Sequence, residues 1–120
     1  MDSAIERALT TDGLIDITTI GRKSGSPSKI EIAFHNFDGA IYITGSPGRR
    51  DWYANLRTNP QLTFHLKHAV QADLPARAVL IEEPDAKRVI LERILQTPGW
   101  SGDLETWVAE SPLIEVVFEA

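Results

Sequence analysis

The chain reads Ile17-Thr18-Thr19-Ile20-Gly21-Arg22-Lys23-Ser24-Gly25-Ser26-Pro27 and, after two apolar runs, Ile43-Thr44-Gly45-Ser46-Pro47-Gly48-Arg49-Arg50-Asp51-Trp52. In both stretches a strand-like segment leads into a glycine-rich turn that carries positive charge, and the second turn opens a short helix. Glycine allows backbone N–H groups to converge, and the start of a helix adds positive dipole character. The two turns are therefore candidate anion-binding sites.

Charge is unevenly distributed along the chain. Between residues 21 and 57, six Lys or Arg residues stand against three Asp or Glu residues, which gives this window a charge of +3 in a chain of −5. A local basic cluster in an acidic protein favours a specific anionic ligand, whereas nucleic-acid binding more often accompanies a basic domain. On charge alone, a solvated hairpin turn is the simpler interpretation.

The composition predicts one globular domain over residues 1–120. Hydrophobic residues make up 42% and charged residues 24% of the chain, as in ordinary globular proteins. No apolar run approaches the length of a transmembrane helix, and the first residues lack the basic start and apolar core of a secretory signal. The absence of cysteine excludes disulfides and thiolate metal sites, and we expect a cytoplasmic protein.

Alternating apolar positions predict six strands, at residues 14–20, 29–36, 40–46, 61–67, 70–81 and 113–119. Helices are expected at residues 2–9, 49–58, 84–96 and 103–110. Pro75 predicts an edge or a bulge in the fifth strand. The apolar stripe of the third helix is expected to consist of Ala86, Val89, Ile90 and Ile94. Six mostly antiparallel strands with few helices favour a small closed barrel, because closure removes exposed edges, so the fold class is mainly β (α+β).

Isolated chemical groups carry little weight by themselves. His65 and His68 are three residues apart on a predicted strand, so they face opposite sides and cannot share a metal; we interpret them as surface histidines. Asp16 is expected at a strand end or in a hydrogen-bonded core position. Trp52 and Asn55 share a helix face beside the second cationic turn, where they either brace the fold or wall a flat ligand.

Two motifs in order carry a family resemblance. Residues 19–27 resemble the T-x-G-R-(K/R)-(S/T)-G-x-P signature, and residues 51–60 the D-W-Y-x-N-L-(R/K)-x-N-P signature, of the deazaflavin-dependent nitroreductase and F420H2-dependent quinone reductase family. The resemblance is strong over residues 17–67. It implies a split β-barrel like those of flavin-mononucleotide-binding, pyridoxamine-phosphate-oxidase-like proteins, with coenzyme F420 as the cofactor and no metal.

The resemblance also implies roles for individual residues. The residues matched to the cofactor's anionic part are Arg22, Lys23 and Ser24. Those matched to the strand end along the deazaflavin ring are Thr44, Gly45 and Ser46, and Ser46 is the candidate catalytic residue. Trp52 and Asn55 match helix residues that close the pocket. The loop after Ser46 is shorter than is usual in the family and contains Pro47, so we expect Arg49 or Arg50 to supply the missing cation.

The resemblance implies an oxidoreductase that transfers a hydride from reduced F420 to a small electrophile, such as a quinone, nitro compound or enone. Because the cofactor carries the hydride, the protein has only to position it and bias its charge. Two alternatives remain: a flavin-mononucleotide (FMN) enzyme on the same barrel, and a non-catalytic protein that binds the cofactor or a fatty acid. The family's substrate-side tyrosines are replaced by Trp100 and Trp107. We expect a homodimer, since such barrels commonly hide an apolar sheet face by pairing.

Overall fold

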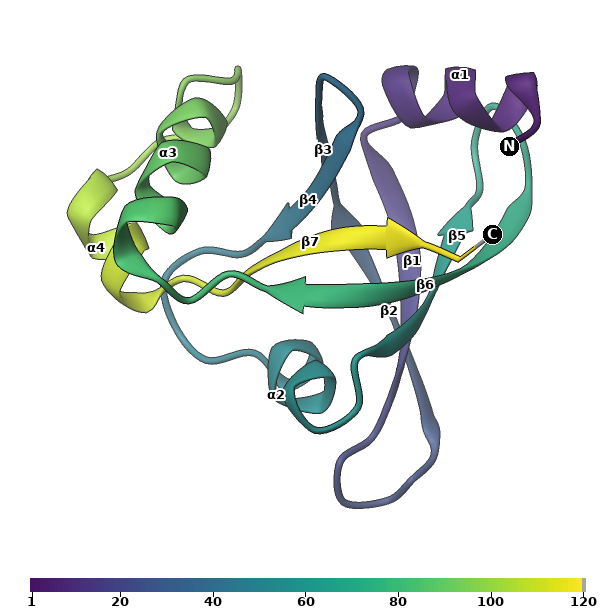
Figure 1. Cartoon of the computed structure of the whole chain (residues 1–120), viewed down its shortest axis with the longest axis horizontal. Coiled ribbons are helices and arrows are strands. Elements are labelled where there is room, and N and C mark those ends of the chain that lie inside the picture. The colour runs from purple at the N-terminus through teal and green to yellow at the C-terminus, as the bar shows by residue number, and fades with distance from the viewer. Residues whose placement is uncertain (120) are drawn as a thin grey trace.

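The structure, a computed structural model that describes residues 1–119, consists of a curved antiparallel sheet flanked by helices (Figure 1). The strands are β1 (Leu14–Ile20), β2 (Pro27–Ala33), β3 (His35–Phe37), β4 (Ala40–Thr44), β5 (Gln61–Leu66), β6 (Ala72–Leu80) and β7 (Leu113–Phe118). They lie in the order β2-β1-β5-β6-β7-β4-β3. The two edge strands of the sheet, β2 and β3, are consecutive in the chain, so the sheet curves back on itself as a half-barrel.

Seven strands replace the predicted six, because the strand expected at residues 29–36 is two strands. β2 pairs with β1, and β3 pairs with β4 on the opposite edge of the sheet. The change of partner falls at Phe34, which is buried against the Phe64 ring in an edge-to-face contact of 5.3 Å. Within the described residues, no hydrogen-bonded ladder joins the edge strands β2 and β3. The barrel is therefore open, and the expectation of a fully closed barrel is wrong.

Pro75 lies in an interior strand, so its predicted edge position is wrong. β6 pairs with both β5 and β7. The Pro75 carbonyl accepts a hydrogen bond from Glu119 N (3.1 Å), and the β7 ladder ends one pair earlier, at Ala76 and Phe118. The missing N–H of proline therefore faces the end of the ladder, where it interrupts little.

The predicted alternation is confirmed in the core. Inward positions of β1, β4, β5 and β7 are buried, among them Ile15, Ile17, Ile43, Phe64 and Ile114. A second cluster forms beneath the helices that precede β7, around Leu91, Ile94, Trp107 and Leu113. The two clusters hold the sheet and the helical excursion together as one body.

Four helices pack around the sheet: α1 (Ser3–Thr11), α2 (Asp51–Thr58), α3 (Pro84–Leu95) and α4 (Leu104–Glu110). In Figure 1, α2 lies across one end of the sheet, and α3 and α4 lie together at the left of the sheet. The predicted stripe of α3 is only partly right: Ala86 and Val89 are exposed, and the buried face is Lys87, Leu91 and Ile94. No helix within residues 1–119 is long and apolar enough to cross a membrane.

Candidate functional site

Two hollows meet at the start of α2. The smaller, of about 480 Å³, lies where β1, β2 and the end of β4 approach α2, and its lining includes Thr19, Ile30, Thr44, Gly45 and Trp52. The larger is an open groove of about 1360 Å³ that runs from Arg22 and α2 to α3 and α4. Arg50 and Asp51 line both hollows, so the first turn of α2 separates them. The size of the smaller hollow is typical of a small-molecule site.

The smaller hollow has a rigid wall. The Thr44 hydroxyl donates to the Pro112 carbonyl (2.5 Å), which ties the end of β4 to the segment before β7. A Cβ at Gly45 would lie 3.3 Å from Arg50 Nε, which is a tight contact, and 3.6 Å from Pro112 Cγ, which is an ordinary one, so a side chain there would press on Arg50. Glycine at this position thus leaves room for the Arg50 side chain beside the wall.

The turn at residues 21–26 is held by its own backbone. Gly21 N donates to the Ser26 carbonyl and Gly25 N to the Gly21 carbonyl, both at 2.8 Å. Gly25 has a φ of +72°, which favours glycine. The Ser24 hydroxyl accepts from Ser26 N (3.1 Å), and Lys23 is exposed. Neither Lys23 nor Ser24 lines a hollow in this structure.

Asn55 joins this turn to α2 from inside. Its Oδ1 accepts from Arg22 N (3.1 Å) and Arg22 Nη1 (2.9 Å), while its Nδ2 donates to the Thr19 hydroxyl (3.1 Å). The Arg22 guanidinium also pairs with Asp51 at 3.2 Å. Asn55 is 4% exposed and lines neither hollow. Of the two interpretations left open by the sequence, bracing the turn is the one its hydrogen bonds describe.

Within the described residues, α2 is the helix whose N-terminus has no side-chain cap. Asp2, Glu83 and Asp103 cap the other three helices through their carboxylates, whereas Arg50 at the N-cap of α2 makes no side-chain cap. Instead its guanidinium donates to the carbonyls of Arg49 (3.0 Å) and Ser46 (2.9 Å). Free N–H groups beside Arg50 suit an anion. Ser46 itself is exposed and outside both hollows.

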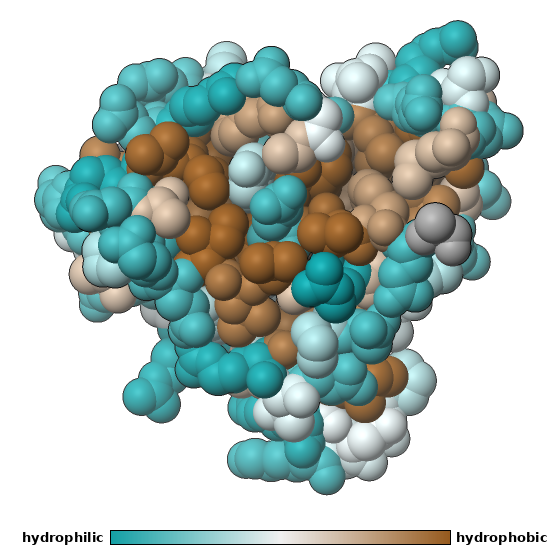
Figure 2. Space-filling view, in the orientation of Figure 1, coloured by the Kyte–Doolittle hydropathy of each residue, from teal (hydrophilic) through white to brown (hydrophobic). Residues whose placement is uncertain are grey.

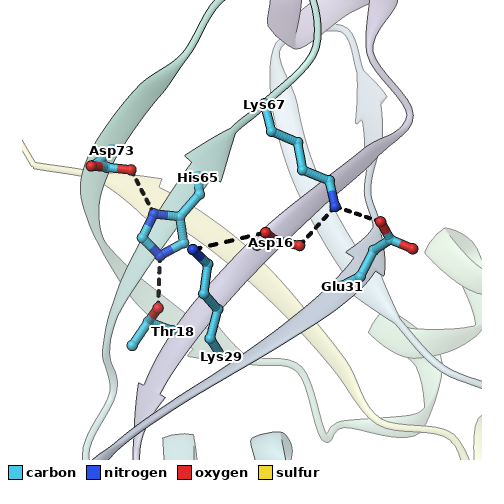
Figure 3. A network of polar contacts seen from close by, with 7 residues as sticks. All are labelled: Asp16, Thr18, Lys29, Glu31, His65, Lys67 and Asp73. Atoms are coloured by element: carbon cyan, nitrogen blue, oxygen red, sulfur yellow. Dashed lines mark hydrogen bonds and ion pairs between the residues drawn. The ribbon is translucent and has the colours of Figure 1, made fainter.

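A polar network on the outer face of the sheet was missed by the sequence analysis (Figure 3). His65 is half-buried, with Nε2 2.7 Å from Thr18 Oγ1 and Nδ1 2.6 Å from Asp73 Oδ1, so the surface-histidine interpretation is wrong for this residue. Beside it, Lys67 bonds both Asp16 (2.9 Å) and Glu31. The pairing of β1 with β5 and of β5 with β6 brings these outward positions together.

The hydroxyl–imidazole–carboxylate arrangement resembles a hydrolytic triad, but its surroundings do not support that chemistry. Neither hollow includes Thr18, His65 or Asp73. Thr18 lies within paired strands, where the backbone N–H groups are used by the sheet rather than gathered as an oxyanion hole. The network instead ties together four neighbouring strands. Within residues 1–119, no group of three or more His, Asp or Glu side chains is placed to hold a metal.

Acid should weaken this network. A hydrogen bond from Lys67 lowers the pKa of Asp16 below its ordinary 3.8, so its contribution to stability is full above that value and is lost as the pH falls through the folded-state pKa. We expect Asp16→Asn to lower the urea midpoint at pH 6, and the gap from wild type to close near pH 2. A gap of equal size at both pH values would show that the Asp16 charge does not act.

Trp100 and Trp107 lie away from the hollows. They contact each other at 6.1 Å between ring centroids, and Trp100 meets the His35 ring at 4.7 Å. Burial lowers the pKa of His35, whose Nε2 has no partner among the described residues. Trp107, which is a residue of α4, and Trp100 therefore belong to the second apolar cluster, which forms around α3 and α4.

Comparison with known proteins agrees with the motifs. The family model described as F420H(2)-dependent quinone reductase matches residues 2–114. The fold is similar to a conserved hypothetical protein from Mycobacterium tuberculosis (17% identity, TM-score 0.75, covering 100% of this chain and 81% of that one). It is also similar to a candidate pyridoxamine 5'-phosphate oxidase from Listeria innocua (18% identity, TM-score 0.72, covering 98% of this chain and 93% of that one). A third similar structure is an F420 reductase (17% identity, TM-score 0.69, covering 96% of this chain and 93% of that one). The chain belongs to the F420H2-dependent quinone reductase family.

Proposed function

We propose that this protein transfers a hydride from reduced F420 to a small electrophile such as a quinone, a nitro compound or an enone. The family match supports F420 as the cofactor. The observation that carries the proposal is the shared border of the two hollows, where Arg50 and the uncapped start of α2 adjoin the glycine-walled end of β4. An anionic ligand with a flat ring fits such a border.

The residues present fit this cofactor. The smaller hollow would take the ring between Thr44, Gly45 and Trp52, with Ser46 at the strand end as the nearest candidate to orient a reacting group. The anionic part would bind Arg22, Lys23 and Ser24 of the turn, together with Arg49 or Arg50. When bound, the cofactor supplies the hydride, so the chain has to bind, orient and exclude water.

Asn55 holds the anion turn in place without touching the ligand. Its three hydrogen bonds fix Arg22 relative to α2 and Thr19 relative to the same helix. The Asp51 carboxylate forms an ion pair with the Arg22 guanidinium in this structure, and an incoming phosphate or carboxylate would compete with Asp51 for Arg22. The exposed Lys23 is free to turn toward that group.

A fluorescence titration of F420 tests the proposal. Arg50→Gln and Lys23→Ala should each weaken binding by roughly ten- to a hundredfold, because a charge-assisted hydrogen bond contributes about 1.5–3 kcal/mol. Arg7→Ala removes the same charge from exposed α1 and should bind like wild type. Equal affinity of Arg50→Gln, Lys23→Ala and Arg7→Ala would place the anionic part elsewhere.

FMN is the second candidate, supported by the likeness in fold to a candidate pyridoxamine 5'-phosphate oxidase. Titrating FMN in the same assay separates the two, since tighter binding of FMN would overturn the choice of F420. Turnover of quinone, nitro and enone acceptors with reduced F420 then separates an enzyme from a protein that only binds the cofactor or a fatty acid.

We also propose that two copies pair through the outer face of β6 and β7. Val79 and Val117 are exposed on these strands, and hydrophobic residues, with hydrophilic ones among them, gather over this part of the surface in Figure 2. Covering such a patch is a common reason for symmetric pairing. Light scattering at micromolar concentration should give the mass of two chains, and a monomer mass would reject the pairing.

A further inference from the structure

The far end of the larger groove contains a buried lysine with little to satisfy it. Lys87 is 8% exposed and lies on the apolar face of α3, yet it lines the groove. Its Nζ donates to the Ser111 carbonyl at 2.7 Å. An ammonium group has three donors, and this is the one hydrogen bond that Nζ makes among residues 1–119. Lysine is rarely buried unless it is paired.

The residue that accepts this hydrogen bond has an unpartnered hydroxyl of its own. Ser111 is 3% exposed, and its Oγ is a buried polar atom without a hydrogen-bond partner in the described part of the chain. Burial lowers the pKa of Lys87, and the charge of Glu82 opposes that shift. Buried polar groups left unpaired in this way destabilise a fold and usually indicate a missing partner.

The charges of the groove point to an anion as that partner. Three of its cations are already paired with carboxylates: Arg22 with Asp51, Arg57 with Glu82, and Arg88 with Glu105. Of the carboxylates that line the groove, Glu110 is the one without an ion pair among residues 1–119. The three remaining cations are Arg49, Arg50 and Lys87, for which the described residues also contain no ion pair. Their positive charge lies in a chain whose net charge is −5.

We propose that Lys87 and Ser111 form a subsite for a carboxylate of the substrate. The segment that contains Ser111 adjoins the strand end, since Gly48 N donates to the Glu110 carbonyl (3.0 Å) and Thr44 to the Pro112 carbonyl. Gly48 and Arg50 line the groove together with Lys87, so a carboxylate on Lys87 would leave the rest of a small molecule in the groove beside them. The subsite thus extends the proposed function and narrows its substrates to electrophiles that carry a negative charge.

The acidic tail of the cofactor is the other source of the same chemistry. The cationic turn at residues 21–25, where the proposed function places that tail, adjoins the Arg22 end of the groove, whereas Lys87 belongs to the end formed by α3 and α4. The two groups would therefore bind together rather than compete, and this separates the two sources in an experiment.

Succinate is the probe, titrated into the ¹⁵N-labelled full chain without cofactor and followed by NMR. In wild type, the amides of Lys87, Ser111 and Gly48 should shift together. Lys87→Met keeps the apolar stem and should weaken binding at least tenfold, and Ser111→Ala should weaken it severalfold, while Arg7→Met should match wild type. Equal binding by all four proteins, or shifts spread over the surface cations, would overturn the subsite.

A second titration is made with F420 at saturation. Unchanged succinate affinity supports a substrate subsite, and displacement by F420 would overturn that assignment in favour of the cofactor tail. The first titration needs no cofactor, so failure of F420 to bind at all would reject the proposed function without affecting the result at Lys87. Thermal unfolding of each variant confirms that the comparison is between folded proteins.

Discussion

Replacing Trp52 with alanine should lower the free energy of unfolding by about 3–5 kcal/mol, which is the usual loss when a large aromatic side chain leaves a core. Trp52 is 6% exposed and belongs to the main core cluster together with Leu56 from the same helix. Its ring also meets that of Tyr53 edge-on at 5.9 Å. Urea unfolding followed by circular dichroism measures the loss.

The matched control is Trp52→Phe, which keeps an aromatic ring in the same place and should lose less than half as much stability. Trp52 also lines the smaller hollow, so both variants should weaken F420 binding. The two effects are separable, because binding is measured at a temperature where each variant is folded. A loss below 1 kcal/mol for Trp52→Ala would mean that the helix is not anchored through this side chain.

Strand positions could be predicted because the period of two is local information. Ile15, Ile17 and Phe64 are buried as the alternation predicts. The predictions that failed were those that depend on strand pairing between residues distant in sequence. The break at Phe34 exists because the chain changes sheet edges there, and alternation continues through it. His65 acquires its partners only through the register that places it beside Asp16 and Asp73.

The candidate site shows the same limit. The two motifs predicted the positions of the turn and of the start of α2. They did not indicate that Asn55 faces inward while Arg50 borders both hollows. Lys87 was missed altogether, although one signal was present. It precedes Leu91 and Ile94 by four and seven residues, so a lysine interrupts the apolar stripe of α3. A charged residue on such a stripe is a reason to look for its partner.

Asn55→Leu should lower the free energy of unfolding by about 2–4 kcal/mol, because Arg22 N–H and the buried Thr19 hydroxyl lose their partner and such losses cost about 1–3 kcal/mol each. Leucine has a similar volume, so the loss comes from hydrogen bonding rather than from a cavity. The turn at residues 21–26 should also move more freely relative to α2. Differential scanning calorimetry measures the stability, and hydrogen exchange of the Arg22 amide reports on the turn.

Asn55→Asp is the discriminating control. It retains the oxygen that accepts from Arg22 N and Nη1, now with a charge that the guanidinium compensates, and the Thr19 hydroxyl can rotate to become the donor. Asn55→Asp should lose less than half as much free energy of unfolding as Asn55→Leu. It should also protect the Arg22 amide from hydrogen exchange nearly as well as wild type does. If Asn55→Asp and Asn55→Leu are equally unstable, the side chain acts through its amide donor to Thr19. Bracing of the anion turn by Asn55 Oδ1 would then be wrong.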